Sequence, residues 1–334
     1  MRAALIDGTG GVTVRDVPGP TAGGRALVRV ERAGVCGTDL KIADGTIPVT
    51  PPRIIGHEMV GRVAAPGPRG LVPSGAQVLV NPAVFCGRCD LCRRDLPQLC
   101  RNGALLGRDA DGGFAEYVAV AEDQLHPLPP GLPMDDAALL QVLSTCVHAQ
   151  SLPHMYVGDS AVVVGLGVSG LLHVQLLRAR GVRTVLAVTR SRWKRDLAAR
   201  LGATGVAAPA DAARLVQEAT DGRGAGVAIE CAGTQETLAL AMDLAGAGGT
   251  VLAFGTTAPT ADGLPTYAWY YKELTILNPR AARPRDCDLA IRLCVDRRLD
   301  LSPLVTARFP LDRTPEAIDA CRDPANLKIV LDVA

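Results

Sequence analysis

Four cysteines fall close together in the first third of the chain, and their thiols could bind a metal ion. Cys86, Cys89, Cys92 and Cys100 follow one another at spacings of 3, 3 and 8 residues. Four thiolates complete the tetrahedral shell of a zinc ion and leave no open position for a substrate. Two disulfides or four unrelated core thiols are the alternatives, but nothing in the sequence indicates an oxidising compartment. The cluster therefore predicts a structural zinc lobe over residues 86–100.

A second group of possible metal ligands precedes the lobe. Cys36 lies in the segment Gly-Val-Cys-Gly-Thr-Asp, and His57 and Glu58 lie in Gly-His-Glu about twenty residues later. Alone, a single cysteine is usually a small core residue and a single histidine a hydrogen-bonded structural group. Nitrogen and sulfur donors of this kind also form zinc sites that keep one position open. Together with the lobe, they are candidate ligands of a second metal ion.

A glycine-rich segment near the middle of the chain has the pattern of a dinucleotide-binding loop. The sequence Gly-Leu-Gly-Val-Ser-Gly, residues 165–170, follows the apolar run 161–164 and precedes an amphipathic segment that ends near Arg180. The first glycine makes a tight turn, the second lets the backbone approach a diphosphate, and the third allows close helix packing. The motif therefore predicts a cofactor site at Gly165, Gly167, Val168 and Gly170, with a merely structural turn as the alternative.

Two patterns of secondary structure must position these residues. Before about residue 150, short strand-like runs are broken by Gly and Pro, which favours an all-β, barrel-like domain. These runs are 26–30, 59–63, 77–80 and 115–118. Beyond residue 150, apolar strands alternate with helical segments, which indicates βαβ units and a parallel sheet. Those strands are 161–164, 184–188, 227–229, 250–254 and 274–277, and a final strand is expected over 328–331.

The length and charge of the chain limit its partners. A chain of 334 residues allows two domains with ample cores. It carries 35 basic and 34 acidic side chains, so its net charge of +1 offers no field to attract nucleic acid or a membrane surface. No run of about 18 apolar residues and no signal-like N-terminus occurs. We therefore expect a cytoplasmic protein that binds small molecules.

Taken together, these motifs resemble those of the zinc-dependent medium-chain dehydrogenases, in particular the polyol, threonine and sugar branch. The resemblance covers nearly the whole chain and includes Asp-Gly-Gly-Phe at 111–114 and Glu-Cys-Ala-Gly at 230–233. It implies a GroES-like β-barrel catalytic domain formed by residues 1–141 and 281–334. It also implies an inserted Rossmann domain, with a doubly wound parallel sheet, over residues 142–280.

The resemblance implies two zinc ions per chain, one structural and one catalytic. Cys36 and His57 match catalytic ligands, but the family's third ligand, a Glu or Cys, is replaced here by Gln141. Some archaeal glucose dehydrogenases of the family also have Gln at this place. We therefore expect Cys36, His57 and Glu58 to be the main ligands, with Gln141 in the shell directly or through water. Cys146, five residues later, is a rival that we expect to pack in the core.

The resemblance also implies a reaction. A zinc ion with an open position lowers the pKa of a substrate hydroxyl, and hydride passes to a nicotinamide cofactor. The residues expected to take part in catalysis are Thr38, Lys41 and Glu58. Thr38 matches a residue that passes the substrate proton outward. Lys41 stands where many relatives have a relay histidine, and a solvated lysine is an equally good interpretation.

The substrate class and the assembly rest on the same resemblance. The branch motifs favour a secondary alcohol, or its ketone, that carries further hydroxyl or amino groups, such as a sugar, polyol, cyclitol or amino alcohol. A threonine-type or simple alcohol dehydrogenase is an alternative, and a catalytically silent dinucleotide-binding zinc protein is an alternative of another class. We expect a homodimer or homotetramer joined through strands such as 251–254.

The end of the second Rossmann strand predicts the choice of cofactor. Members that prefer NAD carry an acid there, which binds the adenosine 2′-hydroxyl and repels a 2′-phosphate. Here Thr189 takes that place and is followed by Arg190, Ser191 and Arg192. Guanidinium groups bind phosphate through paired hydrogen bonds, so these residues favour NADP(H) over NAD(H). The alternative is that both arginines are ordinary surface residues.

Overall fold

Two compact units make up the chain. The computed structural model describes residues 1–8, 11–155, 158–255, 264 and 266–333. Unit one comprises Met1–Ser144, Ala281–Arg297 and Leu301–Ala334, and unit two comprises Thr145–Arg280 and Arg298–Asp300. The domain limits expected from the sequence stay a prediction, because contacts alone do not test whether each part folds by itself.

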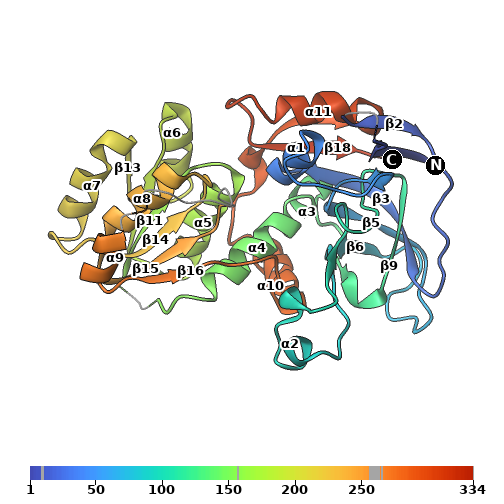
Figure 1. Ribbon diagram of the computed structural model, residues 1–334, viewed down its shortest axis with the longest axis horizontal. Helices are drawn as coiled ribbons and strands as arrows, with labels where there is room; N and C mark the ends of the chain where they lie inside the picture. Colours follow the sequence, from blue (N-terminus) through green and yellow to red (C-terminus); the bar gives the residue numbers. More distant parts are fainter. Residues whose placement is uncertain (9–10, 156–157, 256–263, 265, 334) are drawn as a thin grey trace. The chain divides into compact units, whose positions relative to one another are not determined.

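Unit one is built mainly from antiparallel strands (Figure 1). Its largest sheet has the order β10-β6-β5-β3-β18-β17, with β9 also paired to β3, and smaller sheets have the orders β2-β1-β4 and β7-β8. The strands are β1 (Arg2–Ile6), β2 (Thr13–Asp16), β3 (Ala26–Val35), β4 (Arg53–Ile54), β5 (Glu58–Ala65), β6 (Gln77–Val80), β7 (Ala83–Val84), β8 (Ala104–Leu105), β9 (Tyr117–Val120), β10 (Leu125–Pro127), β17 (Val305–Pro310) and β18 (Lys328–Asp332).

The helices of unit one are short and lie between these strands. They are α1 (Gly37–Ala43), α2 (Asp90–Arg93), α3 (Met134–Ala137), α10 (Pro284–Val295) and α11 (Thr314–Ala320), while α4 (Leu140–Gln150) crosses the boundary between the units. Alternate valines of β3, Val28 and Val30, are fully buried and pack in one core with Val78, Val80 and Phe114. This alternation is the reason that the segment forms a strand with one face on the core.

Unit two holds one parallel sheet with the order β13-β12-β11-β14-β15-β16. Its strands are β11 (Ser160–Val164), β12 (Thr184–Val188), β13 (Gly205–Ala207), β14 (Ala225–Glu230), β15 (Ala245–Ala253) and β16 (Thr275–Leu277). Its helices are α5 (Val168–Ala179), α6 (Arg192–Arg200), α7 (Ala212–Ala219), α8 (Gln235–Leu244) and α9 (Thr266–Tyr271). The strand order is that of the doubly wound dinucleotide-binding fold, so the predicted fold class is confirmed.

The parallel sheet explains the apolar runs of the sequence. All four residues from Ala161 to Val164 are buried, because helices such as α5 and α8 cover the sheet. The carboxyl ends of β11, β12, β14 and β15 share one edge, where ligands of such sheets bind. Among the described residues, no helix combines the length and the apolarity needed to cross a membrane.

A histidine in the core of unit two makes its stability depend on pH. His173 is fully buried in α5, and Phe254 packs edge-on against its ring at 4.8 Å between centroids. The Gln150 side chain donates to the His173 carbonyl oxygen and lies 3.0 Å from the ring Nδ1. Burial lowers the pKa of His173 to about 3, so the folded chain keeps this ring neutral at every pH above that value.

We expect the unfolding free energy to fall as the pH drops from about 6.5, the ordinary pKa of histidine, toward 3. In that range the unfolded chain binds a proton at His173 and the folded chain does not. The free energy of unfolding therefore falls by about 1.4 kcal/mol per pH unit. His173→Gln should remove the contribution of this proton to the slope of the unfolding free energy against pH, which urea unfolding measures. The exposed His154, also in unit two, is the control, and His154→Gln should leave the slope unchanged. An unchanged slope in His173→Gln would contradict the assignment.

Candidate metal and dinucleotide sites

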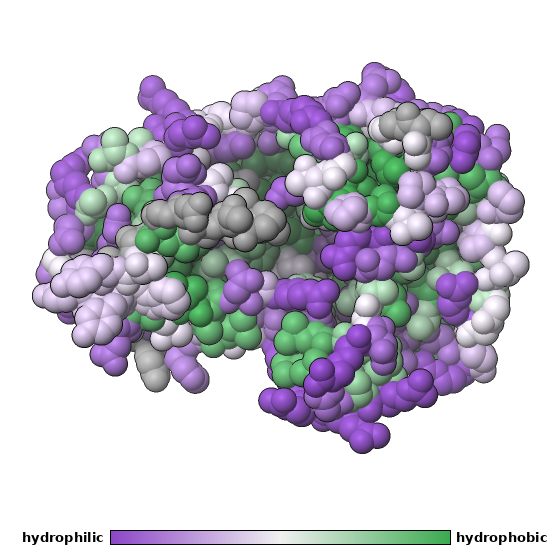
Figure 2. All heavy atoms as spheres, viewed as in Figure 1, coloured by the Kyte–Doolittle hydropathy of each residue, from purple (hydrophilic) through white to green (hydrophobic). Residues whose placement is uncertain are grey.

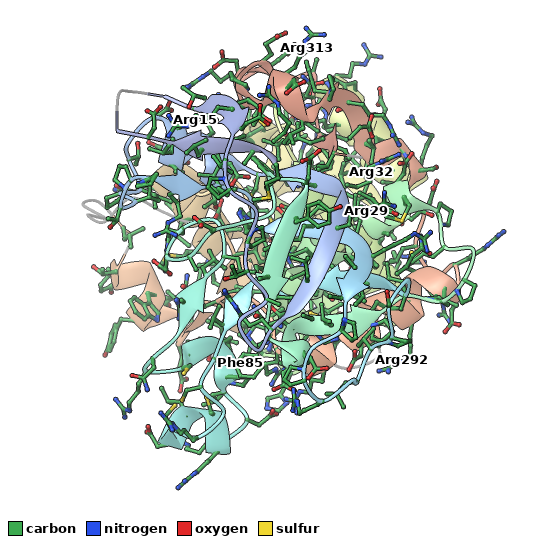
Figure 3. All side chains as sticks on the ribbon, turned by 90° about the vertical axis from the view of Figure 1, so that its right-hand side faces the viewer. Arg15, Arg29, Arg32, Phe85, Arg292 and Arg313 are labelled. Atoms are coloured by element: carbon green, nitrogen blue, oxygen red, sulfur yellow. The ribbon has the colours of Figure 1, made fainter. Side chains whose placement is uncertain are left out.

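The four cysteines of the lobe come together as the sequence predicts. The sulfur atoms of Cys86, Cys89, Cys92 and Cys100 all lie within 4.8 Å of one another. The chain between them turns through α2 and a short 3₁₀ helix, and Figure 3 shows sulfur atoms gathered in this segment below Phe85. An exposed ion pair between Asp90 and Arg101, 2.6 Å long, joins the start of α2 to the residue that follows Cys100.

The electrostatics of the lobe fit a divalent cation. Backbone N–H groups of Arg88 and Cys89 lower the pKa of the Cys86 thiol to about 6. Burial and the neighbouring thiols raise the pKa of Cys92 to about 12, since four thiolates at this distance repel one another. A zinc ion held by these four sulfur atoms would supply the positive charge that offsets this repulsion. The donor set therefore fits a closed structural zinc site with no position left for substrate.

Cys36 and His57 meet at the start of helix α1. Cys36 is the residue before the helix, and its backbone N–H donates to the Asp39 carboxylate at 2.9 Å. The other Asp39 oxygen lies 3.3 Å from Nδ1 of His57. Burial opposes a charged imidazole, but Asp39 and Cys36 outweigh it and raise the pKa of His57 well above its ordinary value. Asp39 thus orients the ring by Nδ1 and leaves Nε2 as the atom that can face a metal ion.

Glu58 completes a group of three donors, of which His57 and Glu58 are buried and Cys36 is half-buried, and it also pairs with a lysine. Donor atoms of Cys36, His57 and Glu58 lie within 4.8 Å of one another. Both Glu58 oxygens accept hydrogen bonds from Lys328 Nζ, at 2.9 and 2.7 Å. Burial opposes the charge of Lys328, but Glu58 and Cys36 outweigh it and raise the pKa of this lysine. A side chain at Gly34 would overlap the Glu58 carboxylate, so the glycine leaves space for this carboxylate in its present position.

The other residues expected at the metal site also belong to unit one. Gln141 is buried near the start of α4. Its main-chain carbonyl oxygen accepts a hydrogen bond from Ser144 Oγ at 2.6 Å. Thr38 and Lys41 are half-buried in α1, and their spacing of three residues places them on one helix face. A metal-binding role for Gln141 and a proton-transfer role for Thr38 and Lys41 stay predictions.

The three glycines of the predicted loop meet three different requirements. Gly165 has a φ of +93°, and a Cβ there would lie 2.8 Å from the backbone N of Ala232. A Cβ at Gly170 would overlap the Gly165 carbonyl oxygen. A Cβ at Gly167 would meet no atom within 4 Å, so this position opens on free space where α5 begins. Open space at a helix N-terminus fits the diphosphate of a dinucleotide.

The segment Thr189–Arg192 follows β12 at the same edge of the sheet. The Gly165 N–H donates to the Val188 carbonyl oxygen at 2.9 Å, which brings the end of β12 against the glycine loop. Arg195 donates to the carbonyl oxygens of Thr189 and Arg190 at 2.7 and 2.8 Å. The Arg190 side chain is exposed, as is that of Arg192.

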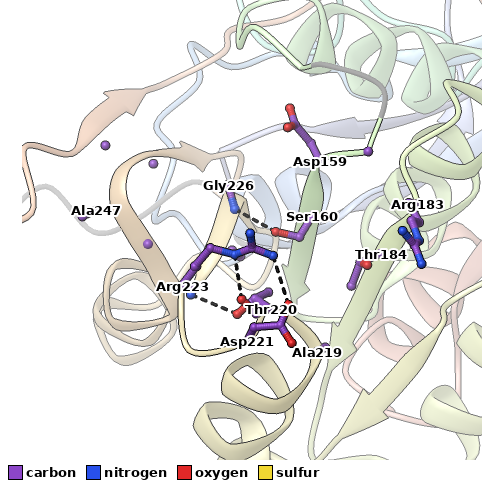
Figure 4. Close-up of a pocket in the computed structure, with 16 residues that line it drawn as sticks. Asp159, Ser160, Arg183, Thr184, Ala219, Thr220, Asp221, Arg223, Gly226 and Ala247 are labelled. Carbon is purple, nitrogen blue, oxygen red and sulfur yellow. Dashed lines mark hydrogen bonds and ion pairs between the residues drawn. The ribbon is translucent and has the colours of Figure 1, made fainter.

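A polar hollow of about 560 Å³ lies at the opposite edge of the parallel sheet (Figure 4). Its lining comes from the starts of β11 and β12 and from glycine-rich turns before β14 and within β15. Arg223 is bonded there to the Thr220 carbonyl oxygen and to Asp221. Because the glycine loop lies at the carboxyl ends of the strands, this hollow is not the dinucleotide site.

Comparisons with known proteins match both parts of the chain. The family model of the alcohol dehydrogenase GroES-like domain matches residues 22–130, and that of the zinc-binding dehydrogenases matches residues 168–296. A protein of Mycobacterium tuberculosis described as a probable zinc-binding alcohol dehydrogenase is 33% identical over 96% of this chain and 85% of its own length. The chain belongs to the zinc-dependent medium-chain dehydrogenases.

The similarity to other members of this dehydrogenase family also covers nearly the whole of each chain. A sorbitol dehydrogenase of Halalkalibacterium halodurans is 29% identical over 97% of this chain and 96% of its own length. Among solved structures, a Sinorhizobium meliloti protein titled a zinc-binding dehydrogenase and bound to NADP superposes with a TM-score of 0.90, at 33% identity and 99% coverage of both chains. The chain is therefore an enzyme that uses zinc and a nicotinamide cofactor.

Three residues of this dehydrogenase that matter to its sites were not among the predicted site residues. Lys328 stands directly before the apolar run 329–331, and a buried lysine needs a partner of opposite charge, so the sequence carried a signal for it. Asp39 lies in the same motif as Cys36, and it contacts both the Cys36 backbone and His57. Arg195 could not be distinguished from other surface arginines, because its hydrogen bonds depend on the path of the backbone at 189–190.

Removing one thiol of the lobe should release one zinc ion per chain. Cys89→Ser leaves three thiolates, and the loop from Cys86 to Cys100 should loosen and lower the melting temperature. The measurement is zinc content by elemental analysis together with thermal unfolding. Cys294→Ser is the control, because this buried cysteine belongs to neither group of metal donors. Full zinc content and an unchanged melting temperature in Cys89→Ser would rule out the four-cysteine site.

Proposed function

We propose that this dehydrogenase interconverts a secondary alcohol and its ketone on a polyhydroxylated or amino-alcohol substrate. The observation that carries the proposal is the group of half-buried Cys36 and buried His57 and Glu58, separate from the four-cysteine lobe. Three protein ligands leave a position open for a substrate oxygen, whereas the lobe leaves none. The similarity to a sorbitol dehydrogenase supports a polyol substrate. The catalytically silent alternative requires no such open site.

The proposed ligands differ in how strongly they are held by the protein. Cys36 and His57 are positioned by Asp39, and we propose them as the main zinc ligands. Glu58 shares its charge with Lys328, so its carboxylate is a weaker donor that can move between the lysine and the metal. We propose that Gln141, a neutral donor, takes part directly or through water.

The chain's own residues would bind and deprotonate the substrate alcohol. Bound zinc supplies Lewis acidity, and bound nicotinamide supplies or accepts the hydride. We propose that the Thr38 hydroxyl accepts the substrate proton and that Lys41, on the same face of α1, contacts the next acceptor or a substrate hydroxyl. The Asp39 carboxylate keeps the His57 ring fixed while the proton leaves.

Loss of one proposed ligand should stop turnover without loss of the cofactor. His57→Ala should abolish turnover and reduce zinc from two ions to one per chain, because the lobe keeps its own ion. Dinucleotide affinity, measured by nicotinamide fluorescence, should stay nearly unchanged, since the proposed cofactor residues belong to unit two. Turnover that persists in zinc-free protein would eliminate the metal mechanism. A wild-type zinc content of one ion would favour a silent relative.

A substrate panel tests the proposed class. Polyols, sugars, cyclitols and amino alcohols, including sorbitol and L-threonine, are assayed for nicotinamide absorbance with both cofactors. Simple primary alcohols serve as the comparison. We expect the largest kcat/KM for a substrate with a hydroxyl or amino group next to the reacting carbon, because vicinal donors can chelate the zinc ion. A clear preference for simple primary alcohols would contradict the proposal.

We also propose NADP(H) as the preferred cofactor. Thr189 replaces the acid that would repel a 2′-phosphate. The Arg190 and Arg192 side chains are both exposed, and Arg195 holds the backbone that presents Arg190. We propose that Arg190 is the main phosphate contact, with Ser191 and Arg192 in support. The NADP-bound structure of a 33% identical relative supports this choice.

Arg190→Ala should raise the Michaelis constant for NADP(H) by one or two orders of magnitude, from about 1.5–3 kcal/mol of lost charged hydrogen bonding. The constant for NAD(H) should hardly change, because NAD(H) has no 2′-phosphate. Steady-state kinetics with both cofactors is the measurement. Arg200→Ala, at the exposed C-terminal end of α6, is the control. A wild-type enzyme that prefers NAD(H) at equal concentrations would overturn this proposal.

We further propose a homodimer or homotetramer, with one correction to the surface expected from the sequence. The segment 251–254 lies largely in β15, which is hydrogen-bonded to β14 and β16 and so offers no free edge. Within the described sheet, β16 is the edge strand on the β15 side, and β13 is the edge strand at the other end. Near it, α9 exposes Tyr267, Tyr270 and Tyr271, and Figure 2 shows a pale patch there rather than the purple of charged groups. These features support association through β16 and α9. Sedimentation measures the oligomeric state.

A further inference from the structure

Glu230 ends strand β14 at the cofactor edge of the parallel sheet, and its side chain is fully buried. Its Oε1 accepts three hydrogen bonds, from the backbone N–H groups of Ala232 and Gly233 at 2.6 and 2.8 Å and from Thr237 Oγ1 at 2.7 Å. The first two donors lie in the turn after β14, and the third lies in the first turns of α8. One oxygen therefore joins the strand, the turn and the next helix.

The turn that Glu230 holds is packed directly against the glycine loop. The Cys231 N–H donates to the Val164 carbonyl oxygen at 2.8 Å, at the end of β11. A Cβ at Gly165 would lie 2.8 Å from the backbone N of Ala232, so the loop and the turn fit only without a side chain. Any shift of the turn therefore changes the space available to the glycine loop.

The same residue also contacts the turn that follows β15. The N–H groups of Phe254 and Gly255 donate to the Glu230 carbonyl oxygen at 2.9 and 3.0 Å. A Cβ at Gly255 would lie 2.6 Å from Oε2 of Glu230 and would overlap the backbone of Gly233. The exits of β11, β14 and β15 thus meet around one buried carboxylate.

The charge of Glu230 makes this arrangement rigid but costly. Hydrogen bonds to an ionised carboxylate are about twice as strong as neutral ones, and three of them converge on Oε1. Its Oε2 is buried, and among the described residues no donor bonds to it. A buried acceptor without a donor costs free energy, so the geometry of the turn is held against a penalty.

We propose that Glu230 is a positioning residue for the diphosphate of the cofactor. By fixing the turn 231–233, it holds Gly165 and the rest of the loop 165–170 in the geometry that receives the diphosphate. The inference rests on the family's use of a nicotinamide dinucleotide and is independent of the choice between NADP(H) and NAD(H). It adds a residue outside the glycine motif to the cofactor site.

The test compares ligands that differ in the diphosphate. Glu230→Gln keeps an acceptor for the three donors but removes the charge, so ADP affinity measured by calorimetry should fall about tenfold. Adenosine 2′-monophosphate has no diphosphate, and its affinity should stay unchanged. If the wild type binds ADP but not adenosine 2′-monophosphate, the NADP(H) proposal fails while the ADP comparison still tests Glu230.

Two matched variants separate positioning from mere stabilisation. Gly255→Ala crowds Oε2 without changing any charge and should weaken ADP binding to a similar extent. Glu236→Gln removes an exposed carboxylate in the first turn of α8 and should leave ADP binding unchanged. A lower melting temperature with wild-type ADP affinity in Glu230→Gln and Gly255→Ala would overturn the proposal.

If Glu230→Gln does not fold, variants of Thr237 carry the test. Thr237→Val removes one of the three donors and should weaken ADP binding, whereas Thr237→Ser keeps the hydroxyl and should restore it. Equal ADP affinity in Thr237→Val and the wild type would overturn the proposal, because the turn would then hold its geometry without the full set of hydrogen bonds.

Discussion

The buried ion pair between Glu58 and Lys328 joins strands that lie 270 residues apart in the sequence. Both side chains are almost completely buried, so removal of either one would leave a charge without compensation inside unit one. Since Glu58 is grouped with Cys36 and His57, the C-terminal strand β18 is part of the candidate metal site. The candidate metal site thus depends on the C-terminal segment, which belongs to unit one although it follows the parallel sheet of unit two in the sequence.

Buried carboxylates organise the candidate sites of both units, but they are compensated in different ways. Glu58 is paired with an ammonium group, which leaves its charge able to respond to a metal ion nearby. Glu230 is held by peptide N–H groups and a hydroxyl, which fix the position of a turn without adding a positive charge. Asp39 stands between these cases, because one oxygen binds the backbone of Cys36 and the other faces His57. In each case a carboxylate determines where neighbouring groups lie.

The two candidate metal sites differ in how far apart their donors lie in the chain. The lobe draws all its donors from residues 86–100, so the thiols can assemble around an ion with little help from the rest of the fold. The second group draws on the start of α1 and the start of β5, and it needs Gly34 to leave space for Glu58. A structural ion suits the first arrangement. A site that must hold an open position suits the second, because the surrounding fold determines which groups approach the ion.

The sequence by itself determined the family and the fold class, and it predicted the two groups of candidate metal donors that the structure brings together, because cysteine spacing and the glycine loop are local patterns with specific chemistry. It also placed β11 and β12 correctly, since strands buried on both faces are apolar throughout. Only the tertiary structure decided that Lys328 meets Glu58, that Asp39 reaches His57, and that β16 rather than β15 has the free edge. These contacts join residues far apart in the chain, and no local pattern specifies which distant strand a buried charge will face. Glu230 combines both kinds of contact. Its three donors lie within seven residues of it in the chain, but the contacts of its segment with Val164 and Phe254 form only when β14 packs between β11 and β15.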